Sequence, residues 1–317
     1  SKTKESPIMS AQPQAIFDHA NTSTPYTRRA HYHCGLNAFD YRWTPVPARQ
    51  FLAERDQAFA AATPTGEIAL DCADALKTAY PATTPTLLMR YLKIRASETL
   101  CCNYVASGEV VYVLSGHGSS RNGRDEIEWG PGDVFCFPGG GETLHRAGGN
   151  DCLLYVATNE PLLAFERLRA PAPGEAVVET THWPAAEIDR QLEAVYSRPV
   201  TSDAPSHYVL FGSQALAPST NTIPSINASI NTIPPGCDQR AHHHNGVAVT
   251  LALQGEGVYS MIDGQRCDWV TGAAQITPAV AVHSHHSRGT QRMRSLIFQD
   301  EALHYYTRTP GFAYDEP

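Results

Sequence analysis

Long apolar runs and clusters of basic residues are both missing from the sequence. No apolar stretch approaches the roughly 18 residues that a membrane-spanning helix needs, and residues 1–14 are polar, without the apolar core of a secretory signal. The longest cluster of Lys and Arg is Arg28-Arg29, and the formal net charge is -8. Such a chain lacks the basic surface that binds nucleic acid or anionic membranes. We therefore expect a cytoplasmic protein with neither of these partners.

Charged residues are also scarce. They make up 18% of the chain, whereas Gly and Pro contribute 23 residues each. This composition argues against coiled coils, collagen and disordered chains, and it favours a turn-rich, mostly β protein. With 317 residues, of which 42% are hydrophobic, the chain has the length of about two domains with a core each.

The cysteines lack any regular spacing. There are eight of them, and the one adjacent pair, Cys101-Cys102, fits neither a zinc ribbon nor a redox CxxC motif. We expect them to be buried free thiols in a reducing compartment rather than disulfides.

An internal repeat organises the chain. Each copy has an alternating apolar run, a glycine turn, an Asn-Gly or Asp-Gly hairpin and a second apolar strand. The repeat predicts two small β-barrels in one chain. The copies are 139 or 140 residues apart when Gly116, Trp129, Gly132 and Pro138 are matched to Gly255, Trp269, Gly272 and Pro278.

The segments around the repeat set the expected domain boundaries. We predict an N-terminal arm with helices over residues 1–84, an N-terminal barrel over 85–165, a linker with a helix over 166–204 and a C-terminal barrel over 205–317. The arm is expected to pack on a partner subunit.

Four local patterns predict particular elements outside the barrels. Proline-bracketed stretches near Ala48–Ala61 and Gly66–Tyr80 predict helices in the arm. Apolar residues on one face predict a helix over Pro184–Tyr196. The polar stretch Ser219–Asn231 is expected to be a loop or an edge strand.

Histidines cluster towards the C-terminus. Of fourteen, six lie between positions 242 and 286. Alternate side chains of a strand share a face, so His242 and His244 are predicted to point one way and His243 the other. His283 follows 39 residues after His244, past a hairpin and a returning strand. Three histidines on two antiparallel strands would form one face of a metal's coordination shell and leave its other positions open.

The spacing of these histidines resembles the two motifs of the cupin superfamily. In the second copy of the repeat, His242 and His244 lie in the first motif and His283 lies in the second. Ala248 stands where most metal-binding cupins have a glutamate ligand. The resemblance implies an all-β-dominated fold of two cupin barrels, each a double-stranded β-helix or jelly roll, with an N-terminal helical arm.

The first copy of the repeat resembles a cupin that has lost its metal. Its glutamate survives as Glu109, but the positions of the paired histidines hold Cys102 and Tyr104. His145 lies two residues later than the second motif requires.

Without the glutamate, the second copy is similar to the gentisate and salicylate 1,2-dioxygenases, which are ring-cleaving bicupins. The similarity covers roughly residues 205–306. It implies one Fe(II) per chain, bound by His242, His244 and His283. It also implies an extradiol-type, non-haem iron dioxygenase that inserts O2 into the ring of a substituted salicylate or hydroxybenzoate and cleaves it. The substrate's carboxylate and hydroxyl would chelate the iron. A homo-oligomer, a tetramer by the same resemblance, is expected, with a small aromatic acid and O2 as partners.

Two features depart from that family. Its iron lies in the N-terminal cupin, whereas here only the C-terminal copy has the three histidines. The arginine that the family places against the substrate carboxylate is Thr250 here, which has the same parity as His244 and is expected to face the metal. Thr250 supplies no charge, so we expect a substrate other than gentisate to be preferred.

The remaining candidates for the substrate pocket follow from position. His285 lies two residues past a ligand and on its face, so we predict that it orients the substrate or moves a proton. Asn231 stands where the family often has a polar substrate contact. The candidate anchors for the substrate carboxylate are Arg240, Arg288 and His207.

Other functions of a bicupin stay open at this point. A three-histidine thiol or diketone dioxygenase would also lack the glutamate. A non-oxidative lyase or isomerase, or a metabolite-binding protein, is a third class, although the absent glutamate argues against manganese.

Overall fold

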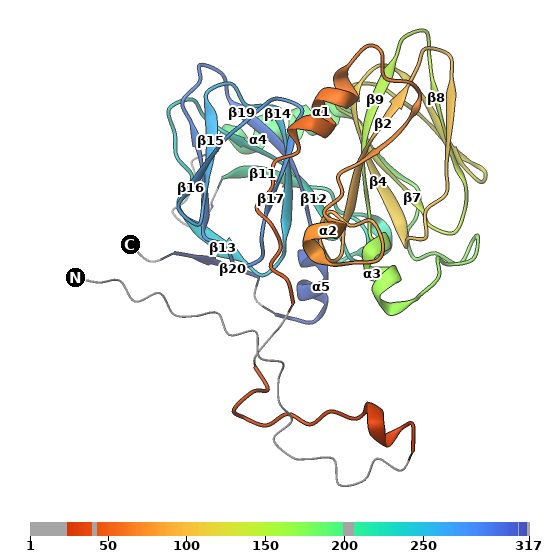
Figure 1. The fold of residues 1–317 in the computed structure, drawn as a ribbon. Coiled ribbons are helices and arrows are strands. Elements are labelled where there is room, and N and C mark those ends of the chain that lie inside the picture. Colours follow the sequence, from red (N-terminus) through yellow and green to blue (C-terminus); the bar gives the residue numbers. More distant parts are fainter. Residues whose placement is uncertain (1–23, 40–42, 199–205, 310, 316–317) are drawn as a thin grey trace. The chain divides into compact units, whose positions relative to one another are not determined.

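The computed structural model describes residues 24–39, 43–198, 206–309 and 311–315 and divides into two compact units, residues 1–45 and 46–317. The described part of the first unit contains the short 3-10 helix η1 (Thr27–Arg29). Residues 1–23 of the predicted arm lie outside the described residues. The second unit holds two barrels (Figure 1).

The N-terminal barrel consists of two antiparallel sheets. Its strands are β1 (Gly66–Ala69), β2 (Leu88–Ile94), β3 (Thr99–Cys102), β4 (Gly108–Ser115), β5 (Gly118–Asn122), β6 (Asp125–Trp129), β7 (Val134–Pro138), β8 (Thr143–Ala147), β9 (Cys152–Thr158) and β10 (Thr181–Trp183). The strand orders are β1-β2-β9-β4-β7-β10 and β3-β8-β5-β6.

The C-terminal barrel repeats this plan with two five-stranded sheets. Its strands are β11 (His207–Leu210), β12 (Asn227–Ile233), β13 (His242–His244), β14 (Ala248–Gln254), β15 (Val258–Ile262), β16 (Gln265–Asp268), β17 (Ala274–Thr277), β18 (His283–Ser287), β19 (Met293–Gln299) and β20 (Phe312–Tyr314). The strand orders are β11-β12-β19-β14-β17 and β16-β15-β18-β13-β20. The predicted β-dominated fold of two barrels is confirmed.

The hairpin prediction is confirmed in the second copy of the repeat and shifted by one residue in the first, where Asn122 pairs with Asp125 and the turn is Gly123-Arg124. In the second copy, Ile262 pairs with Gln265, so Asp263 and Gly264 form a two-residue turn. Both have positive φ angles, 46° and 77°, as a type I′ hairpin turn requires.

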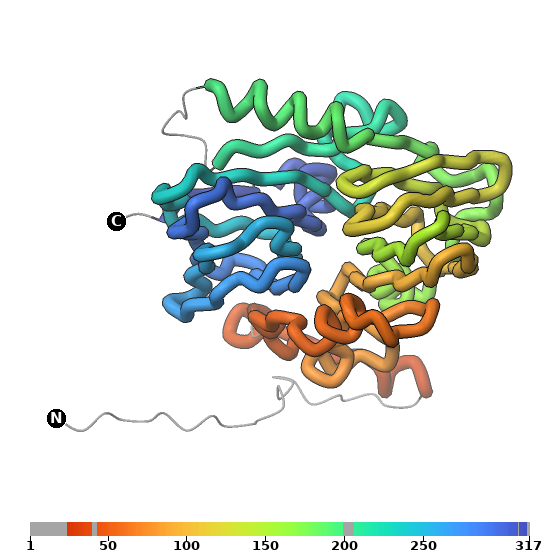
Figure 2. The backbone as a smooth tube through the Cα atoms, turned by 90° about the horizontal axis from the view of Figure 1, so that it is seen from above, coloured from red at the N-terminus to blue at the C-terminus, as the bar shows by residue number. Residues whose placement is uncertain are grey.

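The central strands are buried on both faces because the two barrels pack side by side (Figure 2). Tyr91 of β2 belongs to the core between the barrels, while its neighbour Leu92 belongs to the core inside the N-terminal barrel. The Tyr91 hydroxyl donates a hydrogen bond of 2.6 Å to the carbonyl of Gly272 in the other barrel. The large sheets of both barrels therefore share one hydrophobic core and are joined by this hydrogen bond.

Five short helices decorate the second unit. They are α1 (Leu52–Phe59), α2 (Ala73–Leu76), α3 (Glu160–Glu166), α4 (Ala185–Tyr196) and α5 (Glu301–Tyr306). This unit also contains the 3-10 helix η2 (Gln214–Leu216). None of the helices in the described ranges is long and apolar enough to cross a membrane.

The local predictions are confirmed in two places and wrong in two. Helices form within Ala48–Ala61 and Pro184–Tyr196. Gly66–Tyr80 is not one helix, because Gly66–Ala69 pairs with β2 as an edge strand before the single turn of α2. The end of Ser219–Asn231 is neither loop nor edge strand, since β12 pairs with β11 on one side and β19 on the other.

Candidate metal centre and adjoining cavity

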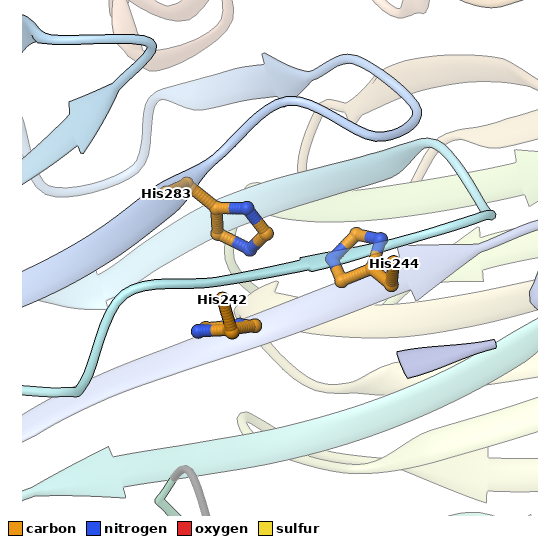
Figure 3. A group of neighbouring side chains, drawn as sticks. All are labelled: His242, His244 and His283. Carbon is orange, nitrogen blue, oxygen red and sulfur yellow. The ribbon is translucent and has the colours of Figure 1, made fainter. Parts of the chain in front are cut away.

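Two short strands bring the three predicted ligands together. His242 and His244 lie on β13 and His283 lies on β18, and the register pairs His242 directly with His283. All three side chains are buried, and their ring nitrogens lie within 4.8 Å of one another (Figure 3). His243, between the first two, points to the opposite face, as strand parity predicts.

Backbone carbonyls determine which nitrogen of each ring faces the group. Nδ1 of His242 lies 2.9 Å from the carbonyl oxygen of Arg240, and Nδ1 of His283 lies 2.9 Å from that of Ala281. Nδ1 of His244 is 2.7 Å from the carbonyl oxygen of Gly246. A carbonyl oxygen only accepts, so each Nδ1 carries the proton and each Nε2 keeps its lone pair for a metal.

Burial also keeps these rings neutral. It lowers the pKa of His242, and it lowers the pKa of His244 to about 4 and that of His283 to about 2. Neutral imidazoles with converging lone pairs are what a transition metal requires, so the residues fit a bound metal ion. The side-chain nitrogen of Gln299 lies 3.3 Å from Nε2 of His244, and this amide has to turn aside when a metal takes that lone pair.

A cavity of about 320 Å³ opens beside the three histidines. Among the described residues, its wall contains no Lys or Arg. The lining residues are Ser206, Tyr208, Leu210, Ser229, Asn231, Gln239, His242, His244, Ala248, Thr250, Thr277, His283, His285, Ile297, Gln299, Glu301, Tyr305 and Phe312.

His285 lines the cavity but is held differently from the ligands. Its Nδ1 lies 2.8 Å from the hydroxyl of Ser260, which accepts hydrogen bonds from the side-chain nitrogens of Trp269 and Gln275, both at 2.7 Å. The hydroxyl proton of Ser260 therefore goes to Nδ1 of His285, and Nε2 of His285 carries the ring proton. Burial lowers the pKa of His285 to about 3, so the ring is a neutral hydrogen-bond donor.

The structure brings some of the predicted substrate contacts together and not others. Asn231 and Thr250 line the cavity, as expected. His207 does not, because it alternates with Ser206 and Tyr208, and its Nε2 lies 3.3 Å from the carbonyl of Arg198.

Neither candidate arginine belongs to the cavity wall. Arg240 lies over the ring of Tyr314, with its guanidinium carbon 4.3 Å from the ring centroid. Arg288 forms an ion pair of 2.6 Å with Asp238. Arg240, Arg288 and His207 thus do not line this cavity, and a carboxylate anchor among them stays a prediction that the cavity wall does not support.

Sequence reasoning missed several polar residues of the cavity. Glu301 and Tyr305 come from α5, directly after the last long strand, and Gln239 precedes the ligand strand. The internal repeat could have indicated Glu301, because Glu160 follows β9 in the first copy as Glu301 follows β19 in the second.

The N-terminal barrel has no such centre. Cys102 pairs with Thr143 at the register position where His242 pairs with His283. Of the residues that the structure describes, only His242, His244 and His283 form a group that could hold a metal ion. A void of about 10 Å³ takes the place of the cavity there.

Comparison with known protein families assigns the C-terminal barrel. Residues 229–298 match the model of the cupin domain. This matched segment lies within the C-terminal barrel. The strands that carry the three histidines, β13 and β18, both lie within the matched residues.

Two curated proteins are similar to parts of this chain. The 5-aminosalicylate 1,2-dioxygenase of Comamonas sp is 36% identical over 81 residues, which are 26% of this chain and 22% of that protein. The gentisate 1,2-dioxygenase of Ralstonia sp is 33% identical over 72 residues, 23% of this chain and 20% of that protein. The matched segment thus spans about a fifth of the length of each relative.

The cupin fold of the whole chain is similar to solved structures. The salicylate 1,2-dioxygenase from Pseudaminobacter salicylatoxidans superposes with a TM-score of 0.73 over 89% of this chain and 92% of that one, at 12% identity. This likeness confirms the predicted bicupin fold.

Proposed function

We propose that the chain is an Fe(II)-dependent dioxygenase that opens the ring of a substituted salicylate or hydroxybenzoate. One observation carries the proposal. Three neutral histidines, each oriented by a backbone carbonyl, present Nε2 lone pairs at a cavity of about 320 Å³ without a carboxylate among them. We assign one iron per chain, because the N-terminal barrel has no corresponding group in its described residues.

The charge of this ligand set favours an anionic substrate. Three neutral ligands leave the 2+ charge of the ion uncompensated, so a chelating pair of phenolate and carboxylate oxygens is attracted to it. Iron in such a site supplies the redox chemistry that lets O2 react with an electron-rich ring.

The polar residues of the cavity would orient the substrate. The proton on Nε2 of His285 is a fixed donor for a substrate oxygen, and its frame of Ser260 and Trp269 holds the ring in place. Asn231 and Thr250 add uncharged polar side chains to the cavity wall. With no cation in the wall, the substrate carboxylate depends on the metal and on these neutral donors.

The relatives support the reaction class. The curated proteins are named as dioxygenases of 5-aminosalicylate and gentisate, and solved structures of the salicylate 1,2-dioxygenase include adducts and complexes with gentisate. Assembly into a homo-oligomer, with a tetramer expected, and a cytoplasmic location stay predictions.

The test combines metal analysis with oxygen uptake. Protein purified without oxygen should contain one iron per chain, and it should consume O2 with salicylates, gentisate or aminohydroxybenzoates. Oxygen uptake with small thiols or diketones alone would favour the other three-histidine dioxygenases. Turnover of a substrate without oxygen uptake would favour a lyase or isomerase.

A further inference from the structure

The two barrels carry matching glutamates at one end. The first residue of β2, Leu88, pairs with the last residue of β9, Thr158, and Glu160 follows two residues later. In the same way, Asn227 opens β12 and pairs with Gln299, the last residue of β19, and Glu301 follows two residues later. Each glutamate opens a short helix, α3 or α5.

In the N-terminal barrel an arginine occupies the space beside this glutamate. Arg90, the third residue of β2, forms an ion pair of 2.6 Å with Glu160. Its guanidinium carbon lies 4.1 Å from the ring centroid of Tyr104. The guanidinium thus fills the space between a glutamate and the residue at the second ligand position.

The C-terminal barrel keeps the glutamate but not the arginine. The third residue of β12 is Ser229, and the second ligand position holds His244. Ser229, His244 and Glu301 all line the cavity. The positions that correspond to Arg90, Tyr104 and Glu160 thus line the cavity in this barrel.

Glu301 is left without a cation. Its residue is only 4% exposed, and its Oε1 has no hydrogen-bond partner. Tyr305, one turn later on α5, donates a hydrogen bond to the carboxylate. The wall holds a second acceptor without a partner, Oε1 of Gln239.

An unpaired acceptor in a buried wall favours one kind of ligand group. A hydrogen-bond donor there recovers the interaction that burial has removed, whereas an anion would be repelled by the carboxylate. An amino group suits the place best, because its two N–H bonds can reach two acceptors, as the Arg90 guanidinium reaches Glu67 and Glu160 in the N-terminal barrel.

We infer that Glu301 is a specificity-determining residue that accepts a hydrogen bond from an amino substituent on the substrate's ring. The amino group takes the place of the Arg90 guanidinium. This inference rests on the proposed function, since it names the class of aromatic acid that the same cavity takes.

Kinetics with matched substrates test the role of Glu301. The wild-type enzyme is compared on 5-aminosalicylate and on the analogue with a methyl group in place of the amino group. We expect kcat/KM to favour the amino compound by about tenfold, the scale of satisfying one buried hydrogen-bond acceptor. Glu301→Gln keeps one acceptor oxygen and exchanges the other for a donor, so it should lower the ratio by lowering kcat/KM for the amino compound only. Glu256→Gln, which alters an exposed glutamate, should leave the ratio unchanged.

The outcomes separate this inference from the proposed function. If the wild type cleaves both compounds with the same kcat/KM, or if Glu301→Gln keeps the wild-type ratio, the inference is wrong and the dioxygenase stands. If no aromatic acid is cleaved, calorimetry without oxygen still compares the two compounds, and equal Kd values overturn the role of Glu301. The wild-type comparison needs no variant, so equal kcat/KM values for the two compounds overturn the inference even if Glu301→Gln does not fold.

Discussion

The two barrels share one internal frame, but beside the ligand positions the C-terminal barrel has a cavity of about 320 Å³ and the N-terminal barrel a void of about 10 Å³. In both barrels, the hydroxyl of a strand serine forms a hydrogen bond with Nδ1 of the histidine 25 residues later. The same hydroxyl accepts a hydrogen bond from the indole N–H of the tryptophan nine residues later. The serine–histidine pairs are Ser120–His145 and Ser260–His285, and the tryptophans are Trp129 and Trp269.

The histidine of this frame has the same structural position in both barrels. His145 corresponds to His285 rather than to the ligand His283, because each pairs across the sheet with the matching serine. The frame is therefore a structural element of both barrels. What distinguishes the C-terminal barrel is what surrounds the frame, where three histidines and a cavity replace Cys102, Tyr104 and Thr143. In the N-terminal barrel, Nε2 of His145 is buried without a partner.

The largest effect is expected from a ligand. His283→Ala should reduce bound iron to background and abolish oxygen uptake, because two histidines alone do not hold the ion. His243→Ala, which removes the histidine between the other ligands on the opposite face, should keep iron at the wild-type level. Metal analysis of both variants checks this, and iron retained by His283→Ala would place the metal elsewhere.

The buried arginine of the N-terminal barrel should matter for stability alone. Arg90→Ser copies the C-terminal residue and leaves Glu160 without its cation, so we expect the free energy of unfolding to fall by about 3 kcal/mol. Denaturant titration measures it. Arg190→Ser, in an exposed pair with Glu187, should barely change stability and serves as the control. Unchanged stability in Arg90→Ser would mean that the pair does not hold the barrel together.

The paired histidines of the frame allow a matched test. His285→Ala should keep iron and lower kcat about 100-fold, the scale of a positioned proton-transfer or donor group. His145→Ala should cost similar stability, since it breaks the same frame, and leave kcat unchanged. If both variants lower kcat equally, the frame acts through stability and His285 has no role in turnover.

The smallest effect concerns the pH dependence of stability. Burial raises the pKa of Glu109 to about 7, although a hydrogen bond from Thr143 opposes the shift. The fold thus favours the protonated acid, and this contribution is present below the usual pKa and is lost as the pH rises through about 7. Glu109→Gln should flatten part of the fall in stability between about pH 4.5 and pH 7. The rest of the fall in stability should remain in this variant, because the pKa values of buried Asp300 and Glu301 are also raised.

Unfolding curves of wild type and Glu109→Gln across that range measure the effect. Glu256→Gln serves as the exposed control. Parallel curves for wild type and Glu109→Gln would show that Glu109 is already ionised in the folded protein.

Strand parity and repeated glycines made most of the fold and the ligands predictable. The histidines needed only the alternation of side chains along two strands, which sequence displays directly. The cysteines were predicted to be free and buried, and those in the described residues are free, but Cys101 and Cys237 are exposed.

The substrate contacts could not be predicted in the same way. His207 has the wrong parity, and this is visible only once the register of β11 with β12 is known. Arg240 and Arg288 are close to the ligands in sequence, yet each is held by a side chain outside the cavity, Tyr314 and Asp238. Arg90 lies beside Glu160 in one barrel, whereas Ser229 and Glu301 line the cavity in the other. This difference becomes visible only when segments that are distant in the chain are placed together.

The central claim is that iron in the C-terminal barrel inserts O2 into an aromatic ring. The most direct measurement is mass spectrometry of the product formed from 5-aminosalicylate by iron-loaded protein under isotopically labelled dioxygen. The account predicts a ring-opened product that carries both labelled oxygen atoms, and no such product from His283→Ala. A product with an intact ring, or a ring-opened product without label, would contradict it.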